Sequence, residues 1–431
     1  MKFIIRDTRG NIRNITRGIL ITLVAIFLLS DSRFLYLIPL STKFGGSASN
    51  KLLMSLISVV CFLFMLIIMK KFRVGLYGKD IIFVYIFILL QMIWLRHQFN
   101  YSITTLIAYY MTYIILLMYF VLSPFLNQKN NFEYFIKIIE IIVSLLSILL
   151  LIQLYFYNSH HHIFLNFTLG DWYTLYHPTA SGRFYSVSDG LTRVAIPLSF
   201  YRYQVNLNKG SKDIFSLTTV ILGMLAILLV DQSRIYFLQE IVTIFVMYLS
   251  LNLKKITLKR IIMGCIVGII FIILVFPKIS SILMTLSDGN SGSVYARQGA
   301  IEYYLSIGKE YLFTGLGLVI PEEGNRYYYL IKGADGIFNY DDIGIFGVFA
   351  SLGILITLWY IFILFKNYWL AYKVKDRFLK SLSYGLATLM LTGIGTMSYL
   401  DGPRIVDLLL TMVIITYSVY KNKETMYKCL E

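Results

Sequence analysis

Residues 134–157 read "YFIKIIEIIVSLLSILLLIQLYFY", a run in which Lys137 and Glu140 are the only charged side chains. A helix that crosses a membrane needs about 20 largely apolar residues, so this run predicts one. Similar runs recur along the chain, which is 58% hydrophobic and only 14% charged. A soluble domain has about one-quarter charged residues. The sequence therefore predicts an all-α polytopic integral membrane protein.

The same length rule predicts about twelve transmembrane helices, within a single polytopic membrane domain that covers residues 1–431. They are expected near residues 18–40, 51–70, 80–96, 103–123, 134–157, 186–204, 214–230, 235–252, 261–283, 342–365, 378–399 and 404–420.

The basic residues orient these helices. The chain has 39 Lys and Arg against 23 Asp and Glu, an excess that in a soluble protein would point to nucleic acid. With the N-terminus in the cytoplasm, about two-thirds of the Lys and Arg fall on the cytoplasmic side, as the positive-inside rule requires. The contrast is clearest in "KKFRVGLYGK" (70–79), "LKKITLKR" (253–260) and "KNYWLAYKVKDRFLK" (366–380). We therefore expect both termini in the cytoplasm and no nucleic-acid partner.

Two connections are longer than the rest, residues 158–185 and 284–341, and this orientation places both outside the cytoplasm. Loops of this length are uncommon unless they carry a function or are disordered. In the second, "YARQGAIEYYLSIGKEYLF" (295–313) has the apolar spacing of one helical face. That face consists of Ala300, Tyr303, Tyr304 and Ile307. We expect a large, partly helical extracytoplasmic loop whose helix lies along the membrane surface.

Arginines occur on the outer side, where the positive-inside rule disfavours them. They include Arg183, Arg193, Arg234, Arg297, Arg326 and Arg404. A guanidinium presents a planar fork of donors that matches phosphate oxygens, so these residues are candidates to bind an anion.

The alternative for these arginines is pairing with acids at helical spacing. The pairs would be Asp189 with Arg193, Asp231 with Arg234, and Arg404 with Asp407. Arg183 and Arg297 have no acidic partner at that spacing and are the sharper candidates.

Candidate acid–base groups lie in the same two loops. His177, in "YTLYHPTASGRF" (173–184), is a candidate because histidine titrates near neutral pH, although a lone loop histidine is more often merely exposed. The segment "GADGIFNYDDIG" (333–344), before the tenth expected helix, contains Asp335, Asp341 and Asp342. A partly desolvated Asp at a membrane boundary can take a proton from a hydroxyl. The alternative for Asp341 and Asp342 is to cap the following helix.

No metal or cofactor site is predicted. The three consecutive histidines of "SHHHIF" (159–164) cannot all face one ion. The three cysteines form no zinc or disulfide pattern. No D-x-D box, nucleophile elbow or phosphate-cradling glycine loop accompanies the arginines. Any chemistry is expected to be metal-free.

Several segments, taken in order, resemble the O-antigen and capsular polysaccharide polymerase family, together with the related O-antigen ligases. They are "GRFYSVSDGLTRVAIP" (182–197), "DQSRIYFLQ" (231–239), "ARQGAIEYYL" (296–305) followed by "TGLGL" (314–318), and "DDIGIFGVFASLG" (341–353). Their order and their shared side of the membrane carry the resemblance, which covers most of the chain in layout.

The resemblance implies a polysaccharide polymerase of the bacterial cytoplasmic membrane. Such an enzyme joins polyprenyl-pyrophosphate-linked oligosaccharide repeat units on the outer face and releases polyprenyl pyrophosphate. Its partners would be this lipid-linked donor and acceptor, the lipid bilayer, a flippase and a chain-length regulator. Arg183, Arg234 and Arg297 match the family's outer arginines and would hold the donor pyrophosphate. Many ligases carry a His-Asn pair before the acidic-x-Gly motif, where this chain has no His and offers Asp335.

Two alternatives stay open: an O-antigen ligase-type transfer to another acceptor, and a flippase or transporter of lipid-linked oligosaccharides. A transporter would also need about twelve helices and a cationic cavity, but it tends to place charges deep in the membrane. For the polymerase, the predicted catalytic residues are Arg297 and Asp335 or Asp342. The predicted substrate-binding residues are Arg183, Arg193, Arg234, Arg326 and His177.

Overall fold

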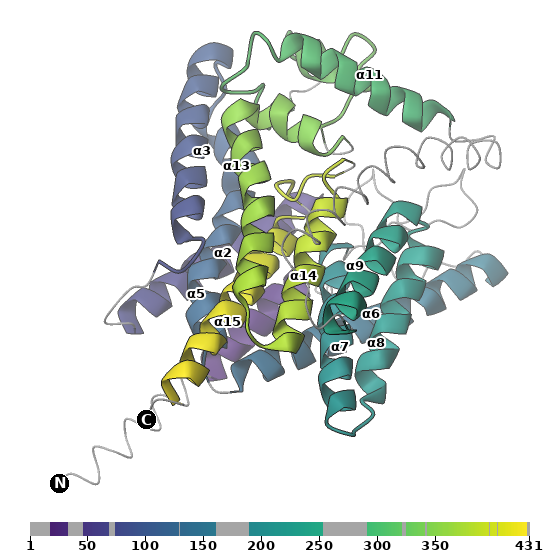
Figure 1. Ribbon diagram of the computed structural model, residues 1–431. Coiled ribbons are helices and arrows are strands. Elements are labelled where there is room, and N and C mark those ends of the chain that lie inside the picture. Colours follow the sequence, from purple (N-terminus) through teal and green to yellow (C-terminus); the bar gives the residue numbers. More distant parts are fainter. Residues whose placement is uncertain are drawn as a thin grey trace. The chain divides into compact units, whose positions relative to one another are not determined.

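The computed structural model describes residues 18–32, 46–68, 74–128, 130–160, 189–252, 291–320, 325–340, 343–395, 397–402 and 404–428 (Figure 1). Helix makes up 81% of this part and no strand occurs in it, so the all-α class is confirmed. The expected span 261–283 lies outside the described residues, as do Arg183, His177, Asp341 and Asp342.

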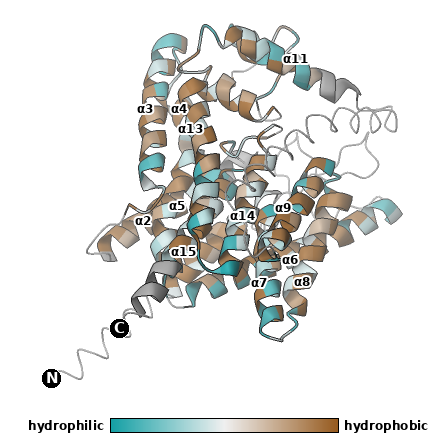
Figure 2. Ribbon diagram, viewed as in Figure 1, coloured by the Kyte–Doolittle hydropathy of each residue, from teal (hydrophilic) through white to brown (hydrophobic). Residues whose placement is uncertain are grey.

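Five helical segments of the described ranges are long and apolar enough to cross a membrane. They are α3 (Gly78–Phe99), a composite of α4 (Ile103–Tyr110), η3 (Met111–Leu117) and α5 (Met118–Leu126), then α6 (Asn131–His160), α9 (Arg234–Asn252) and α13 (Ile345–Lys373). Most residues along these helices are hydrophobic (Figure 2). In α3, for example, Leu89 and Leu90 are 60% and 61% exposed. Such exposure is costly in water and natural against lipid, so this is a helical membrane protein.

Six further helices also overlap an expected span. They are a helix at Gly18–Asp31, α2 (Gly46–Ile68), α7 (Asp189–Asn208), α8 (Ile214–Leu225), α14 (Arg377–Thr392) and α15 (Ile405–Lys428). The full set of twelve spans and their orientation stay predictions.

The chain divides into two compact units. Unit 1 consists of residues 1–83, 110–244 and 401–431. Its α15 packs against α5, η3 and α7, and all side chains of residues 405–419 are buried. Helices α6, α7 and α8 pack against one another in the same unit. Helix α15 is therefore the core helix of unit 1.

Unit 2 consists of residues 84–109 and 245–400, and it contains α13, α14 and the described part of the long connection. That connection includes α11 (Ser291–Ile307) and the short α12 (Tyr328–Lys332). The expected helical face is present in α11: Ala300 and Tyr304 are buried in a core cluster, and Tyr303 and Ile307 pack against it. The cluster also includes Ala350 of α13, so the connection folds onto that helix.

Helix α13 is broken where the connection docks. Gly353 has φ 74° and ψ 180°, a backbone conformation that glycine adopts far more readily than other residues. The connection's backbone pairs with the break, because Leu316 N donates to Ala350 O (2.7 Å) and Ile354 N donates to Leu312 O (2.8 Å). A Cβ on Gly353 would lie 2.5 Å from the carbonyl oxygen of Phe313. The span expected at 342–365 is thus a broken helix that anchors the loop.

Candidate functional site

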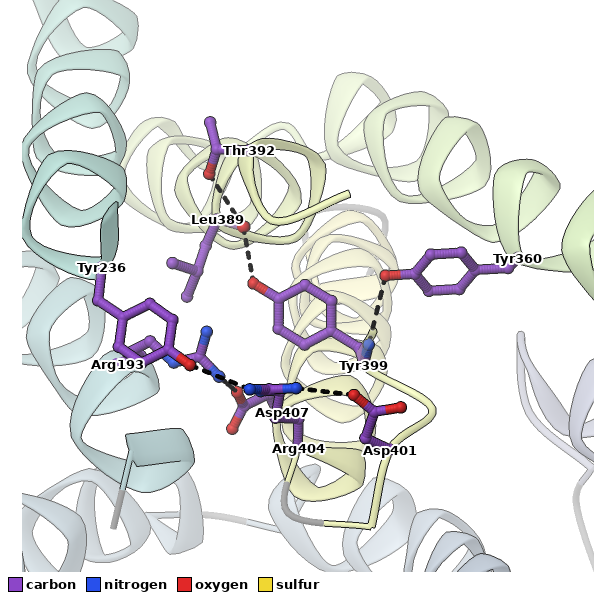
Figure 3. A network of polar contacts seen from close by, with 9 residues as sticks. All are labelled: Arg193, Tyr236, Tyr360, Leu389, Thr392, Tyr399, Asp401, Arg404 and Asp407. Carbon is purple, nitrogen blue, oxygen red and sulfur yellow. Dashed lines mark hydrogen bonds and ion pairs between the residues drawn. The ribbon is translucent and has the colours of Figure 1, made fainter. Parts of the chain in front are cut away.

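In unit 1, the first turns of α7 and α15 are joined by a buried ion pair. Arg193 Nη2 lies 2.5 Å from Asp407 Oδ2, and both side chains are fully buried (Figure 3). The partner expected from helical spacing was Asp189, whose side chain lies outside the described residues; the described partner is Asp407. Because α7 and α15 pack side by side, the guanidinium reaches a carboxylate on the neighbouring helix.

The described ion pair of Arg404 is with Asp401, three residues before it. Its Nη1 donates to Asp401 Oδ2 at 2.7 Å, while Asp407 pairs with Arg193. Asp401 precedes α15, so the ion pair closes the turn that leads into this helix. Arg193 and Arg404 are therefore both neutralised by acids of unit 1.

Tyr236, in the first turn of α9, connects both arginines. The guanidinium carbon of Arg193 lies 4.7 Å from the centroid of the Tyr236 ring, a cation–π distance. Arg404 Nη2 donates to the Tyr236 hydroxyl at 3.1 Å (Figure 3). We call Arg193, Tyr236, Asp401, Arg404 and Asp407 the helix-start cluster. It fixes the starts of α7, α9 and α15 to one another, and the expected topology puts all three at the outer side.

Glu240 lies one helical turn beyond Tyr236 on α9 and is fully buried. Neither carboxylate oxygen has a hydrogen-bond partner among the described residues. Arg193 and Asp407 are close enough to act on it electrostatically. The sequence analysis did not single out Glu240, although an acid within an apolar run is itself a signal of function.

Arg234 is the first residue of α9 and is exposed, just before the helix-start cluster. The turn before it is irregular, because η4 (Ala226–Val230) is a π-helix and Gln232 has φ 48°. Ser233 N closes the turn by donating to Ile227 O at 3.2 Å. π-Helical turns and left-handed non-glycine residues are costly and concentrate at functional sites. Arg234 makes no ion pair with a described residue.

In unit 2, Arg297 lies in the second turn of α11 and is half-buried. Its Nε is buried and has no hydrogen-bond partner in the described part of the chain. A buried donor without a partner costs free energy, which a bound acceptor would remove. Arg297 therefore suits the anion-binding role expected from the sequence.

The other expected residues of this loop are exposed. Asp335 lies in the turn Gly333–Gly336, which Gly336 N closes by donating to Gly333 O at 3.0 Å. Arg326 lies over the ring of Tyr327, 4.4 Å from its centroid, and donates to the Tyr327 hydroxyl. In the described ranges, no hydrogen bond or ion pair joins Arg297 to Asp335. The loop thus carries an arginine with a buried, unpartnered Nε and an exposed carboxylate on one folded segment.

The expected site residues consequently fall into two sets, Arg193 and Arg234 in unit 1, and Arg297, Arg326 and Asp335 in unit 2. The described residues contain no group of three or more His, Cys, Asp or Glu that could hold a metal ion. The chain matches no protein-family model, and no curated protein is significantly similar to it in sequence.

Proposed function

We propose that the protein is a membrane polysaccharide polymerase, which joins polyprenyl-pyrophosphate-linked oligosaccharide units on the outer face of the cytoplasmic membrane. The observation that carries the proposal is the division among its arginines. Arg193 and Arg404 are committed to ion pairs that fix three helix starts, whereas Arg234 and Arg297 have no ion-pair partner among the described residues. These two arginines, together with Arg183, are the ones that match the outer arginines of the polymerase family.

In the reaction, an acceptor hydroxyl attacks the anomeric carbon of the donor and the bond from that carbon to the pyrophosphate oxygen breaks. The electron pair stays on the departing pyrophosphate, whose growing charge an arginine such as Arg297, in the same unit as Asp335, would stabilise. The proton of the hydroxyl passes to a carboxylate acting as base. Asp335 is the accessible candidate in the described loop, and Asp342 is the candidate that lies outside it.

The test is polymer formation by the purified protein from lipid-linked repeat units. Arg234→Lys and Arg297→Lys keep the charge and lose the bidentate fork, so each should lower polymer formation about 10²-fold or more if it stabilises the leaving group. Arg377→Lys is the matched control, because Arg377 is also an exposed first residue of a helix, α14, on the expected cytoplasmic side. A normal ladder of polymer lengths from both test variants would exclude the proposal.

One observation favours the alternative, a transporter of lipid-linked oligosaccharides. Arg193, Asp407 and Glu240 are fully buried within the helices of unit 1, where transport proteins often keep ionisable groups. Polymerisation needs only enzyme and substrates, whereas transport needs a sealed membrane. Polymer formation in detergent solution would therefore support the enzyme, and movement across vesicles without polymer would support the transporter.

A further inference from the structure

The charges around Glu240 do not balance. Arg193 contributes one positive charge, and Asp407 already pairs with it at 2.5 Å. Glu240 is a second carboxylate on which the charge of Arg193 acts, and it is fully buried. Among the described groups, Arg193 and Asp407 are the charges that act on Glu240, and Arg404, which contacts Tyr236, is neutralised by Asp401. An ionised carboxylate without donors or water costs several kcal/mol, so this site needs one more positive charge.

The oxygens around Glu240 suit a cation that carries a single positive charge. Both oxygens of Glu240 lack hydrogen-bond donors in the described part of the chain, and so does the buried hydroxyl of Thr243, one turn further on the same face of α9. On α15, the buried hydroxyl of Thr411 lies one turn after Asp407 and also lacks a hydrogen-bond partner in the described part of the chain. Carboxylate and hydroxyl oxygens are ligands for hard cations. A divalent ion would leave a net positive charge beside Arg193, whereas a monovalent ion leaves none.

We propose that Glu240 anchors a binding site for a monovalent cation, Na⁺ or H⁺, inside unit 1. This inference does not rest on the proposed polymerase activity, because glycosyl transfer requires no such ion. The site lies one turn from Tyr236, which fixes the start of α9 and therefore the position of Arg234. Cation occupancy would thus stabilise the helix-start cluster, and its loss would loosen it.

The first test is chemical labelling of the protein in detergent with dicyclohexylcarbodiimide, which adds to protonated carboxyl groups in apolar surroundings. Mass spectrometry of the peptide that contains Glu240 gives the rate. In Na⁺-free buffer we expect labelling that slows with rising pH, approaching about tenfold per pH unit above the pH at which Glu240 ionises. Slower labelling with added Na⁺ at fixed pH, but not with choline, would identify a Na⁺ site, and dependence on pH alone would identify a proton site. Failure to label at any pH without Na⁺, or labelling insensitive to both ions, would overturn the proposal.

The second test is the dependence of the melting temperature on the cation. A ligand that binds only the folded state raises this temperature as its concentration rises. Glu240→Gln resembles the neutral side chain and should fold. For a Na⁺ site, its melting temperature should no longer rise with Na⁺. For a proton site, the difference in melting temperature between wild type and variant should change with pH, because the other acids titrate in both proteins. Glu140→Gln is the matched control, because Glu140 is a buried glutamate of unit 1 whose oxygens have donors, and its response should persist. An unchanged response in Glu240→Gln would place the cation elsewhere and refute the site.

Discussion

Two polar clusters, one near each end of α7, differ in how completely their oxygens are satisfied. Near its C-terminal end, Arg202 Nη1 lies 2.5 Å from Glu140 Oε2, and Ser216 Oγ donates to Glu140 Oε1 at 2.7 Å. Asp213 there accepts from Asn206 at 2.7 Å and from Ser216 N at 3.1 Å. Near the N-terminal end, Arg193 and Asp407 pair equally closely, but Glu240 beside them has no donor among the described residues.

The difference separates a structural ion pair from a candidate site. A fully satisfied buried network specifies how helices pack and needs nothing further. A buried carboxylate without donors is destabilising by itself, and a protein retains one where a ligand or a proton completes it. The first cluster therefore links α6, α7 and the start of α8, and the second marks a candidate place for a ligand or proton.

The largest effect is expected from Arg193→Met. It removes the only guanidinium that acts on both Asp407 and Glu240 among the described contacts, and it leaves two buried acids. Loss of one member of a buried pair costs about 3–5 kcal/mol, which thermal unfolding in detergent would measure. Adding Asp407→Leu should restore part of the loss, because an apolar pair is tolerated where a lone charge is not. A loss below about 1 kcal/mol in the single variant would mean that the pair is not buried as described.

A smaller effect is expected from Arg202→Met in the satisfied cluster. The Arg202 side chain is 22% exposed, so water can partly replace its charge, and Ser216 still donates to Glu140. We expect a loss of about 1–3 kcal/mol, measured by the same unfolding experiment. If Arg202→Met were as damaging as Arg193→Met, the two clusters would not differ in the way that their hydrogen bonds indicate.

Much of this architecture could be predicted from the sequence, because spanning helices depend on local composition. The helix of the long connection was also predictable, since its apolar spacing is local. The break in α13 was not, because Gly353 continues an apolar run and only the docked backbone of Leu312 and Leu316 shows why glycine is required. The site was predictable only as a set of arginines. Arg193 pairs with a residue 214 positions away, and no local pattern contains that information.

The two buried glutamates should respond in opposite directions to the same substitution. Glu140→Gln removes the ion pair with Arg202 and should destabilise the protein by about 1 kcal/mol at neutral pH. Glu240→Gln removes a carboxylate that has no donors, so in buffer without added Na⁺ it should be neutral or slightly stabilising. Chemical denaturation of both variants at the same pH would make the comparison. A destabilising Glu240→Gln under these conditions would show that the carboxylate has partners beyond the described contacts.

The smallest effect concerns Asp213, which caps α8 outside the apolar spans. Burial alone would raise its pKa, but hydrogen bonds from Ser216 and Asn206 and the charge of Arg202 outweigh it, so the pKa is lowered. A carboxyl with a lowered pKa stabilises the folded state above its unfolded value, about 4, and this stability is lost as the pH falls through the folded value. Asp213→Asn keeps a cap acceptor for Ser216 but cannot titrate, and it should cost only about 0.5–1 kcal/mol at neutral pH. The difference in unfolding free energy between wild type and variant should therefore shrink as the pH falls below about 4. Because every other acid is present in both proteins, a constant difference across this range would show that the satisfied cluster does not depend on the charge of Asp213.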